Sequence, residues 1–127
     1  MTVLVNLTRH PIAVMAHLVR YADEVGSHKV VLSPSGEVAR VEVTQEDAGL
    51  LPTGDGYAVS VVSNTYGEVE GLPDPVPGVA YVVSGRVLSA LQDVGSDRTD
   101  VYGPDTGPTA VRDDGGHIVA VVRLVAL

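Results

Sequence analysis

The triplet Asp105-Thr106-Gly107 contains residues whose types and spacing suggest a specific reaction. Asp-Thr-Gly carries the catalytic carboxylate of aspartic proteases, in which two such carboxylates share a proton at close range. That chemistry needs an apolar strand to deliver each aspartate. Here Pro104 precedes the triplet and Pro108 follows it, and both prolines interrupt a strand ladder. We therefore reject the protease and predict a turn in which Asp105 accepts a hydrogen bond from its own backbone.

The histidines do not have the spacing of a metal site; they are His10, His17, His28 and His117. Zinc sites usually show a close pair of ligands backed by a third, and none of the four has such a partner. The absence of cysteine excludes disulfides, thiolate metal sites and cysteine nucleophiles. We expect no metal and no cofactor. His10 stays a candidate ligand-binding residue, because it precedes Pro11 in a turn between two expected strands.

Three arginines in the second half of the chain are candidates for holding an anion: Arg86, Arg98 and Arg112. A guanidinium grips carboxylate or phosphate through two parallel hydrogen bonds. A helix N-terminus also attracts anions, and Ser84 lies with Arg86 at the expected start of a helix. The alternative is that the other two arginines pair with acids nearby in the sequence, Arg98 with Asp97 or Asp100 and Arg112 with Asp113.

Thr65 and Tyr66 belong to a second polar cluster, NTYGEVEGLPDP, at residues 64–75. Tyr66 offers a ring face for stacking and a hydroxyl for hydrogen bonding. Both residues are therefore included in the predicted ligand site. The alternative is an ordinary strand that runs into a proline-rich turn.

The chain is acidic, with 16 Asp and Glu against 8 Lys and Arg and a formal charge of −8. Such a charge repels the phosphates of duplex nucleic acid and anionic membranes, so we expect neither as a partner. No apolar run approaches the roughly 20 residues that span a bilayer. The first residues lack the pattern of a signal peptide, which with the absence of cysteine predicts a reducing cytosol.

Valine dominates the apolar residues, since 26 of the 127 residues are Val and neither Trp nor Phe occurs. Val is β-branched and favours extended backbone. We predict a single mainly β domain over residues 1–127, a small barrel or sandwich of about seven strands, with one short helix near 84–92. Ser84 can cap that helix, and its expected buried face holds Val87, Leu88 and Leu91.

The expected strands are runs of apolar residues between turn signals. One hairpin is predicted over 29–43, turning at Pro34-Ser35-Gly36, and another over 110–127, turning at Asp114-Gly115-Gly116. Connections are expected at 44–56 and 95–109, and further strands at 2–7, 11–19, 57–66 and 79–84. Two helical turns over residues 15–25 are the alternative to the second of these strands.

The last arm of the chain, residues 117–126, is longer than one face of a small barrel needs. An uncovered strand edge pairs readily with another chain. We therefore expect a second subunit to cover this edge, in a symmetric homo-oligomer.

Three stretches of the sequence carry a resemblance: NLTRHPIAV, NTYGEVEGLPDPVPGVAYVVSGRVLSAL and RTDVYGPDTGPTAVRDDGGHIVAVVRL. They resemble a family of small proteins of bacteriophages, prophages and actinobacterial genomes to which no activity is assigned. Residues 16–30 fall outside the resemblance and are interpreted as an insertion. The resemblance implies an accessory protein of a mobile element that acts in the cytoplasm of a bacterial host, and it brings no catalytic residues.

These observations give three hypotheses for function. The first is a module that binds a small anionic molecule such as a signalling nucleotide, and sequesters it as an anti-defence protein. The alternative is an acidic protein-interaction module that inhibits a host protein, or a structural component, which the charge of −8 favours. The third is an enzyme, for which the sequence offers no P-loop, nucleophile elbow or His-Glu-x-x-His helix.

Overall fold

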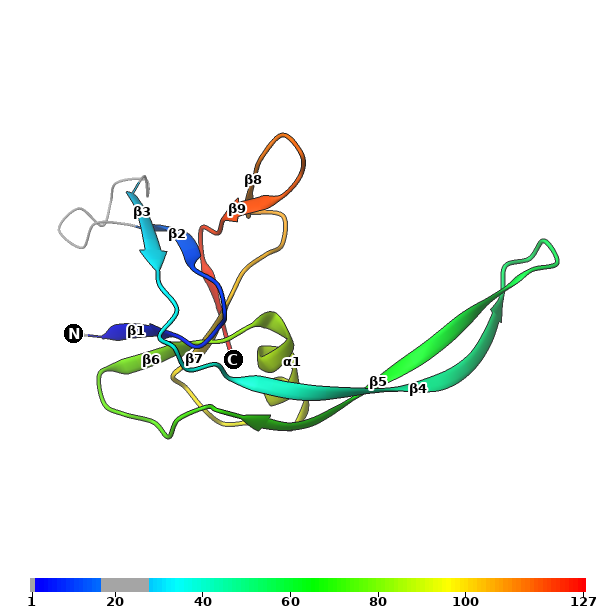
Figure 1. The fold of residues 1–127 in the computed structure, drawn as a ribbon, viewed down its shortest axis with the longest axis horizontal. Helices are drawn as coiled ribbons and strands as arrows, with labels where there is room; N and C mark the ends of the chain where they lie inside the picture. The colour runs from blue at the N-terminus through cyan, green and yellow to red at the C-terminus, as the bar shows by residue number, and fades with distance from the viewer. Residues whose placement is uncertain (1, 17–27) are drawn as a thin grey trace.

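A four-stranded sheet forms the body of the protein in the computed structural model, which describes residues 2–16 and 28–127 (Figure 1). Its strands lie in the order β1 (Val3–Asn6), β6 (Val79–Val82), β7 (Val101–Pro104) and β10 (Leu124–Ala126). The first three strands run parallel, and β10 runs antiparallel to β7. The helix α1 (Gly85–Asp93) connects β6 to β7, as a crossover between parallel strands requires.

The hydrophobic core gathers side chains from this sheet and from α1. Val87, Leu88 and Leu91 share one face of the helix, and each of them is buried. Burying a Val or Leu side chain contributes about 1.5–3 kcal/mol. Gly103 lets the helix approach β7 closely, because a Cβ at that position would lie 3.1 Å from Cδ2 of Leu88. The core therefore fixes where the first turn of α1 lies.

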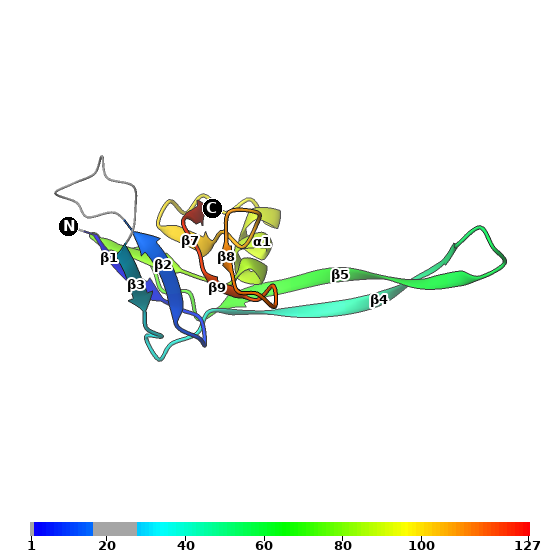
Figure 2. The same cartoon turned by 90° about the horizontal axis from the view of Figure 1, so that it is seen from above.

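Two small sheets of two strands each lie beside the body (Figure 2). Their strands are β2 (Ile12–Ala16) with β3 (His28–Leu32), and β8 (Val111–Arg112) with β9 (Ile118–Ala120). A bridge between Val14 and Val121 joins the two pairs. This bridge brings the N-terminal third of the chain against its C-terminal hairpin.

A long two-stranded ribbon, β4 (Arg40–Pro52) with β5 (Ala58–Glu70), extends away from the body (Figures 1 and 2). At its base, Val41 and Val69 are partner residues and pack against the core. Beyond the base, every residue from Thr44 to Thr65 is exposed. The ribbon thus has an anchored base and a free outer part.

The prediction of a mainly β fold with one short helix is confirmed. The described residues contain ten strands in four separate sheets, and no single barrel or sandwich unites them. Ser84 caps α1 as predicted, since its hydroxyl oxygen accepts a hydrogen bond from the Val87 N–H at 3.3 Å. No helix in the described part of the chain has the length and apolar character to cross a membrane.

The prediction of a hairpin over residues 29–43 is wrong, because β3 pairs with β2 and β4 pairs with β5. Gly36 does adopt a positive φ of 97°, as the predicted turn requires. The segment nevertheless runs on past the end of β1, where the Ser35 N–H donates to the Asn6 carbonyl and the Ala39 N–H to the Leu7 carbonyl, both at 3.0 Å. The turn signal was correct, but the strand partners were not.

Three other expected elements differ in extent. The connection predicted at 44–56 is mostly strand, because its true turn is confined to residues 53–57 between β4 and β5. The loop predicted at 95–109 contains β7, whose Val101 is buried beside β6. The arm predicted at 117–126 is divided into β9 and β10, which belong to different sheets. The strand predicted at 11–19 is observed as β2, and residues 17–19 lie outside the described residues.

Candidate functional site

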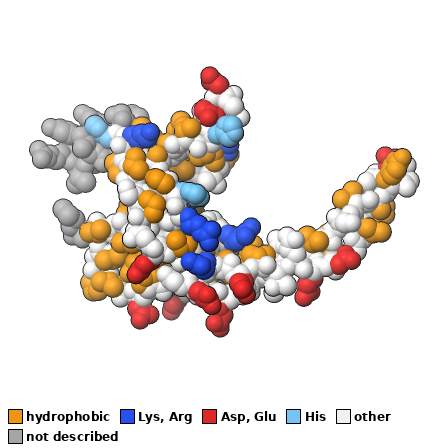
Figure 3. All heavy atoms as spheres, viewed as in Figure 1, with side chains coloured by type: hydrophobic (Ala, Val, Ile, Leu, Met, Phe, Trp, Pro, Cys, Tyr) orange, Lys and Arg blue, Asp and Glu red, His pale blue; other side chains and the backbone are white. Residues whose placement is uncertain are grey.

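One pocket, of about 370 Å³, collects three arginines and a histidine beside the N-terminus of α1. Arg9 and His10 come from the turn after β1, Arg40 begins β4, and Arg86 lies in the first turn of α1. We call this group the arginine pocket. Figure 3 shows Lys and Arg side chains gathered next to a histidine at the base of the β4–β5 ribbon. Three segments that are distant in sequence therefore meet at one cationic site.

Asn6 positions the turn that presents Arg9 and His10. Its side chain is only 2% exposed, and its amide nitrogen donates to the carbonyls of His10 and Leu32, both at 2.9 Å. Its side-chain oxygen accepts from the N–H of Thr8 at 2.8 Å and from the Thr8 hydroxyl at 2.7 Å. All of the amide's main hydrogen-bonding groups are used, as burial of a polar side chain requires. The turn from residue 6 to residue 10 is thus held from inside.

A second fixed segment delivers Arg40. The backbone bond from the Ala39 N–H to the Leu7 carbonyl places residues 38–40 alongside the turn. Gly71, at the end of β5, packs against the same segment, because a Cβ there would lie 2.4 Å from the Val38 carbonyl oxygen. Its φ of +80° is also one that only glycine adopts without strain. Arg40 therefore starts its strand at the rim of the pocket.

The first turn of α1 supplies N–H groups as well as a charge. Its first intrahelical bond runs from the Leu88 N–H to the Ser84 carbonyl, so the earlier N–H groups of Gly85 and Arg86 have no partner within the helix. The positive end of the helix dipole favours acidic side chains, yet this turn has none and carries Arg86 instead. An arginine there is mildly unfavourable for the helix itself. A bound anion would offset that cost.

No side chain of the arginine pocket forms an ion pair within the part of the chain that the structure describes, although Glu70 is the cross-strand partner of Arg40 at the rim. The three ion pairs found among the described residues are Arg98–Asp100, Arg123–Asp105 and His117–Asp113. Neither Asp nor Glu lines the pocket among those same residues. In a chain of charge −8, this site is locally positive and can attract an anion.

Of the residues predicted from sequence, the pocket brings together Arg86, Ser84 and His10. Arg98 lies in a different hollow, together with Asp97 and Asp100. Arg112 lies on the β8–β9 hairpin, where its guanidinium donates to the carbonyls of Gly116 at 2.8 Å and Thr106 at 3.4 Å. The three arginines therefore do not converge, although each was a reasonable candidate by type.

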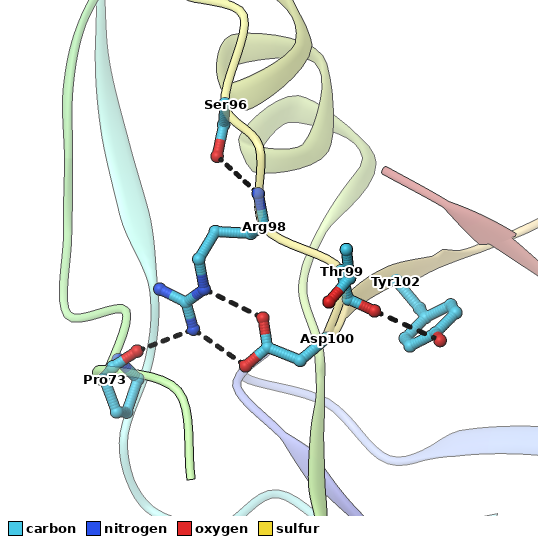
Figure 4. A network of polar contacts seen from close by, with 6 residues as sticks. All are labelled: Pro73, Ser96, Arg98, Thr99, Asp100 and Tyr102. Atoms are coloured by element: carbon cyan, nitrogen blue, oxygen red, sulfur yellow. Dashed lines mark hydrogen bonds and ion pairs between the residues drawn. The ribbon is translucent and has the colours of Figure 1, made fainter. Parts of the chain in front are cut away.

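Arg98 binds neighbouring protein groups (Figure 4). Its Nε and Nη2 donate to the two carboxylate oxygens of Asp100 at 2.8 and 2.9 Å, and Nη2 also donates to the Pro73 carbonyl at 2.9 Å. The Arg98 hydrogen bonds lower the pKa of Asp100, and the same contact raises the pKa of Arg98. This arginine ties the loop after α1 to the turn after β5, which is the alternative that the sequence left open.

Thr65 and Tyr66 lie on β5, paired with Thr44 and Val43. Thr65 is exposed and Tyr66 is half-buried, and neither lines the arginine pocket. Their position fits the other interpretation of this segment, a strand that ends in a proline-rich turn.

Asp105 forms the predicted turn. Its Oδ1 accepts a hydrogen bond from the Gly107 N–H at 3.0 Å, and its Oδ2 pairs with Arg123. These donors, Arg123 first and Gly107 second, lower the pKa of Asp105. A carboxylate held ionised in this way is opposite to the proton-sharing pair of an aspartic protease. No group of three or more His, Cys, Asp or Glu among the described residues is arranged to hold a metal ion.

Sequence reasoning did not find Arg9 or Arg40. A signal for Arg9 was present, because it adjoins His10 in a turn already considered as a site. Arg40 alternates in sequence with Ala39, Val41 and Val43, a pattern in which it looks like an ordinary surface residue of a strand. Only the backbone bonds between the segment before β4 and the end of β1 place the two arginines at one pocket.

Comparisons with protein-family models, with curated proteins and with solved structures find no match to this chain. The resemblance to proteins of phages and actinobacterial genomes therefore stays a prediction. Function has to be argued from the arrangement of the side chains themselves.

Proposed function

We propose that this protein binds a small anionic ligand in the arginine pocket and acts by holding it. The observation that carries the proposal is that Arg9, Arg40 and Arg86 line one pocket with no acidic side chain among its described residues. Three guanidinium groups at one pocket suit an oxyanion with several acceptor oxygens, such as a phosphate. The N–H groups at the start of α1 add donors of the same kind.

The size and lining of the pocket narrow the ligand class. A volume of about 370 Å³ is at the small end of ligand sites, and accommodates a phosphate-bearing molecule of mononucleotide size. Among its described residues the lining contains no Tyr, Phe or Trp, and the only ring on which a base would stack is the imidazole of His10. Phosphate contacts should therefore dominate the affinity, and the base should contribute less.

Binding without conversion is the part of the proposal that concerns mechanism. Arginine keeps its proton at neutral pH, so three arginines supply charge and hydrogen bonds but no acid–base chemistry. In the context that the sequence resemblance implies, a protein of a mobile element in a bacterial cytoplasm, such binding would sequester a signalling nucleotide.

Calorimetric titration with inorganic phosphate, pyrophosphate and a panel of nucleotides tests the proposal. For any anion that binds, Arg86→Ala should weaken affinity about tenfold or more, which corresponds to about 1.4 kcal/mol. Raising the salt concentration should weaken binding further, because exposed charges are screened.

Arg112→Ala is the matched control, since it removes the same charge from an exposed site outside the pocket. The proposal is wrong if none of these anions binds at millimolar concentration. It is also wrong if the control weakens binding as much as Arg86→Ala does.

A second candidate function is binding to another protein. It is favoured by the outer part of the β4–β5 ribbon, which exposes large apolar side chains away from the body. This function does not compete with anion binding, because none of the described residues that line the arginine pocket lies in the outer part of the ribbon.

A further inference from the structure

We propose that the outer part of the β4–β5 ribbon, residues 44–65, is an assembly arm that docks onto a second copy of this chain. This inference is independent of anion binding. It rests on the exposure of the arm, on the chemistry of its two faces and on an apolar groove elsewhere on the body.

The arm carries apolar side chains where a soluble ribbon would carry polar ones. The most exposed of them are Leu50 (70%), Leu51 (62%), Tyr57 (75%), Val59 (54%) and Val62 (54%). Single exposed apolar residues are normal on a protein surface, but a contiguous group marks an interaction site. These five side chains together expose on the order of several hundred Å² over the two faces of the arm, against the ~800 Å² per partner of a standard interface.

Both faces of the arm carry apolar side chains near its outer end, although only one of them holds an apolar cross-strand pair. Partner residues in an antiparallel pair point to the same face, and Leu51 is paired with Val59. On the opposite face, Leu50 is paired with Ser60 and Val62 with Asp47. An isolated two-stranded ribbon is only marginally stable in water, so cover from a partner would stabilise this arm.

The charge of the arm restricts its partner. Residues 41–85 contain no Lys, Arg or His, whereas the ribbon carries six acidic residues: Glu42, Glu46, Asp47, Asp55, Glu68 and Glu70. Duplex nucleic acid and anionic membranes would repel such a surface. The partner must therefore be a protein that offers an apolar surface free of acidic side chains.

The body of the chain offers a surface of that kind. A groove of about 180 Å³ lies between the β2 and β9 segments, lined by apolar residues that include Ile12, Ala13, Ile118, Val119 and Val121. Among its described residues the groove has no charged side chain. An apolar arm and an uncharged apolar groove on one chain are complementary surfaces.

The arm cannot fill the groove of its own chain. Strands of 13 residues rising about 3.3 Å each extend about 40 Å. Figures 1 and 2 both show the outer end of the ribbon far from every other element. The arm can therefore reach such a groove only on another molecule, and in the proposed assembly each copy contributes one arm and one groove.

Light scattering coupled to size-exclusion chromatography tests the proposal on the full chain at about 50 µM. We expect a dimer or larger assembly rather than a 13.2 kDa monomer. Val59→Asp should weaken the association at least tenfold, because it places a charge on the face of the arm that carries Leu51. Val76→Asp is the matched control: its side chain is similarly exposed (48%) but lies off the arm, and it should assemble like the wild type.

A second variant, which lacks the arm, tests the proposal even if Val59→Asp disturbs the folding of the arm. Replacing residues 44–65 with Asn-Gly joins Val43 to Tyr66, which are already paired, through a two-residue turn. This shortened chain should fold and remain a monomer. On the groove side, Val119→Asp by itself should prevent assembly. Mixing it with Val59→Asp should restore partial association, because the intact arm of the Val119 variant then meets the intact groove of the Val59 variant.

Two outcomes overturn the proposal: a wild type that is monomeric at this concentration, whatever other protein its arm captures, or a shortened chain that still assembles. Failure of anion binding would be seen separately. Salt should strengthen assembly, since both copies carry −8, whereas it should weaken anion binding. Arg86→Ala should assemble normally.

Discussion

Replacing Arg98 with methionine should destabilise the fold while leaving anion affinity unchanged. The Arg98 side chain is 18% exposed and its partner Asp100 is 17% exposed, so water only partly replaces their contacts. The change removes two bonds to the carboxylate and one to the Pro73 carbonyl. Hydrogen bonds to charged groups contribute about 1.5–3 kcal/mol each, but these share one carboxylate and are not additive. We expect the free energy of unfolding to fall by about 2–3 kcal/mol.

Urea denaturation at neutral pH measures this loss. With a slope of about 1–3 kcal/mol per molar urea, the midpoint should fall by about 0.7–3 M. Arg86→Met serves as the reciprocal variant: its side chain is exposed and unpaired among the described residues, so it should lose affinity and keep its stability.

The pH dependence of the Arg98 variant gives a second measure. The folded-state pKa of Asp100 is lowered by Arg98, so the stabilisation from this pair is present above the usual carboxyl pKa of about 3.9 and is lost as pH falls through the folded value. The difference in free energy of unfolding between the wild type and Arg98→Met should therefore shrink below about pH 4. If Arg98→Met instead abolishes anion binding in a fully folded sample, the assignment of the pocket is refuted. An unchanged urea midpoint would refute the structural role.

Two further predictions concern other residues. Asn6→Ala should lower the free energy of unfolding by about 2–4 kcal/mol, because it leaves the carbonyls of His10 and Leu32 without their buried donor. It should also weaken anion binding several-fold, which calorimetry on the folded variant measures. Unchanged affinity would show that the turn keeps its conformation without Asn6. Asp105→Asn should make stability fall less steeply as pH is lowered, because Arg123 and Gly107 lower the pKa of Asp105 and the stabilisation from its carboxylate is lost as pH falls. Thermal melts between about pH 3 and pH 7 compare the variant with the wild type. Parallel profiles would contradict this.

The helix was predictable because its signals are local. Ser84 precedes a run in which Val87, Leu88 and Leu91 fall on one face, and no distant residue is needed to recognise that pattern. Strand pairing is a different matter. Pro34-Ser35-Gly36 has the composition of a hairpin turn, but its flanking strands find better partners in β2 and β5. Periodicity predicts that a segment is extended, and not which strand it meets.

The site was half predictable for the same reason. His10, Ser84 and Arg86 each sit next to a turn or helix signal that is visible in the sequence. Arg9 and Arg40 join them only because residues 34–39 pack beside the end of β1. Arg98 lies apart from the pocket and donates to the carbonyl of Pro73, which is 25 residues away in the chain and is brought near by the end of β5. Contacts of this range are set by the tertiary fold.

The ribbon leaves the body at Val43 and Tyr66, and from Thr44 to Thr65 no side chain belongs to the core. Insertions, deletions or substitutions in that stretch should therefore leave the helix and the arginine pocket unchanged. Lengthening the ribbon by two residues on each strand would carry its end about 7 Å further out, at no cost to the packed interior. The length of the ribbon can therefore vary independently of the arginine pocket.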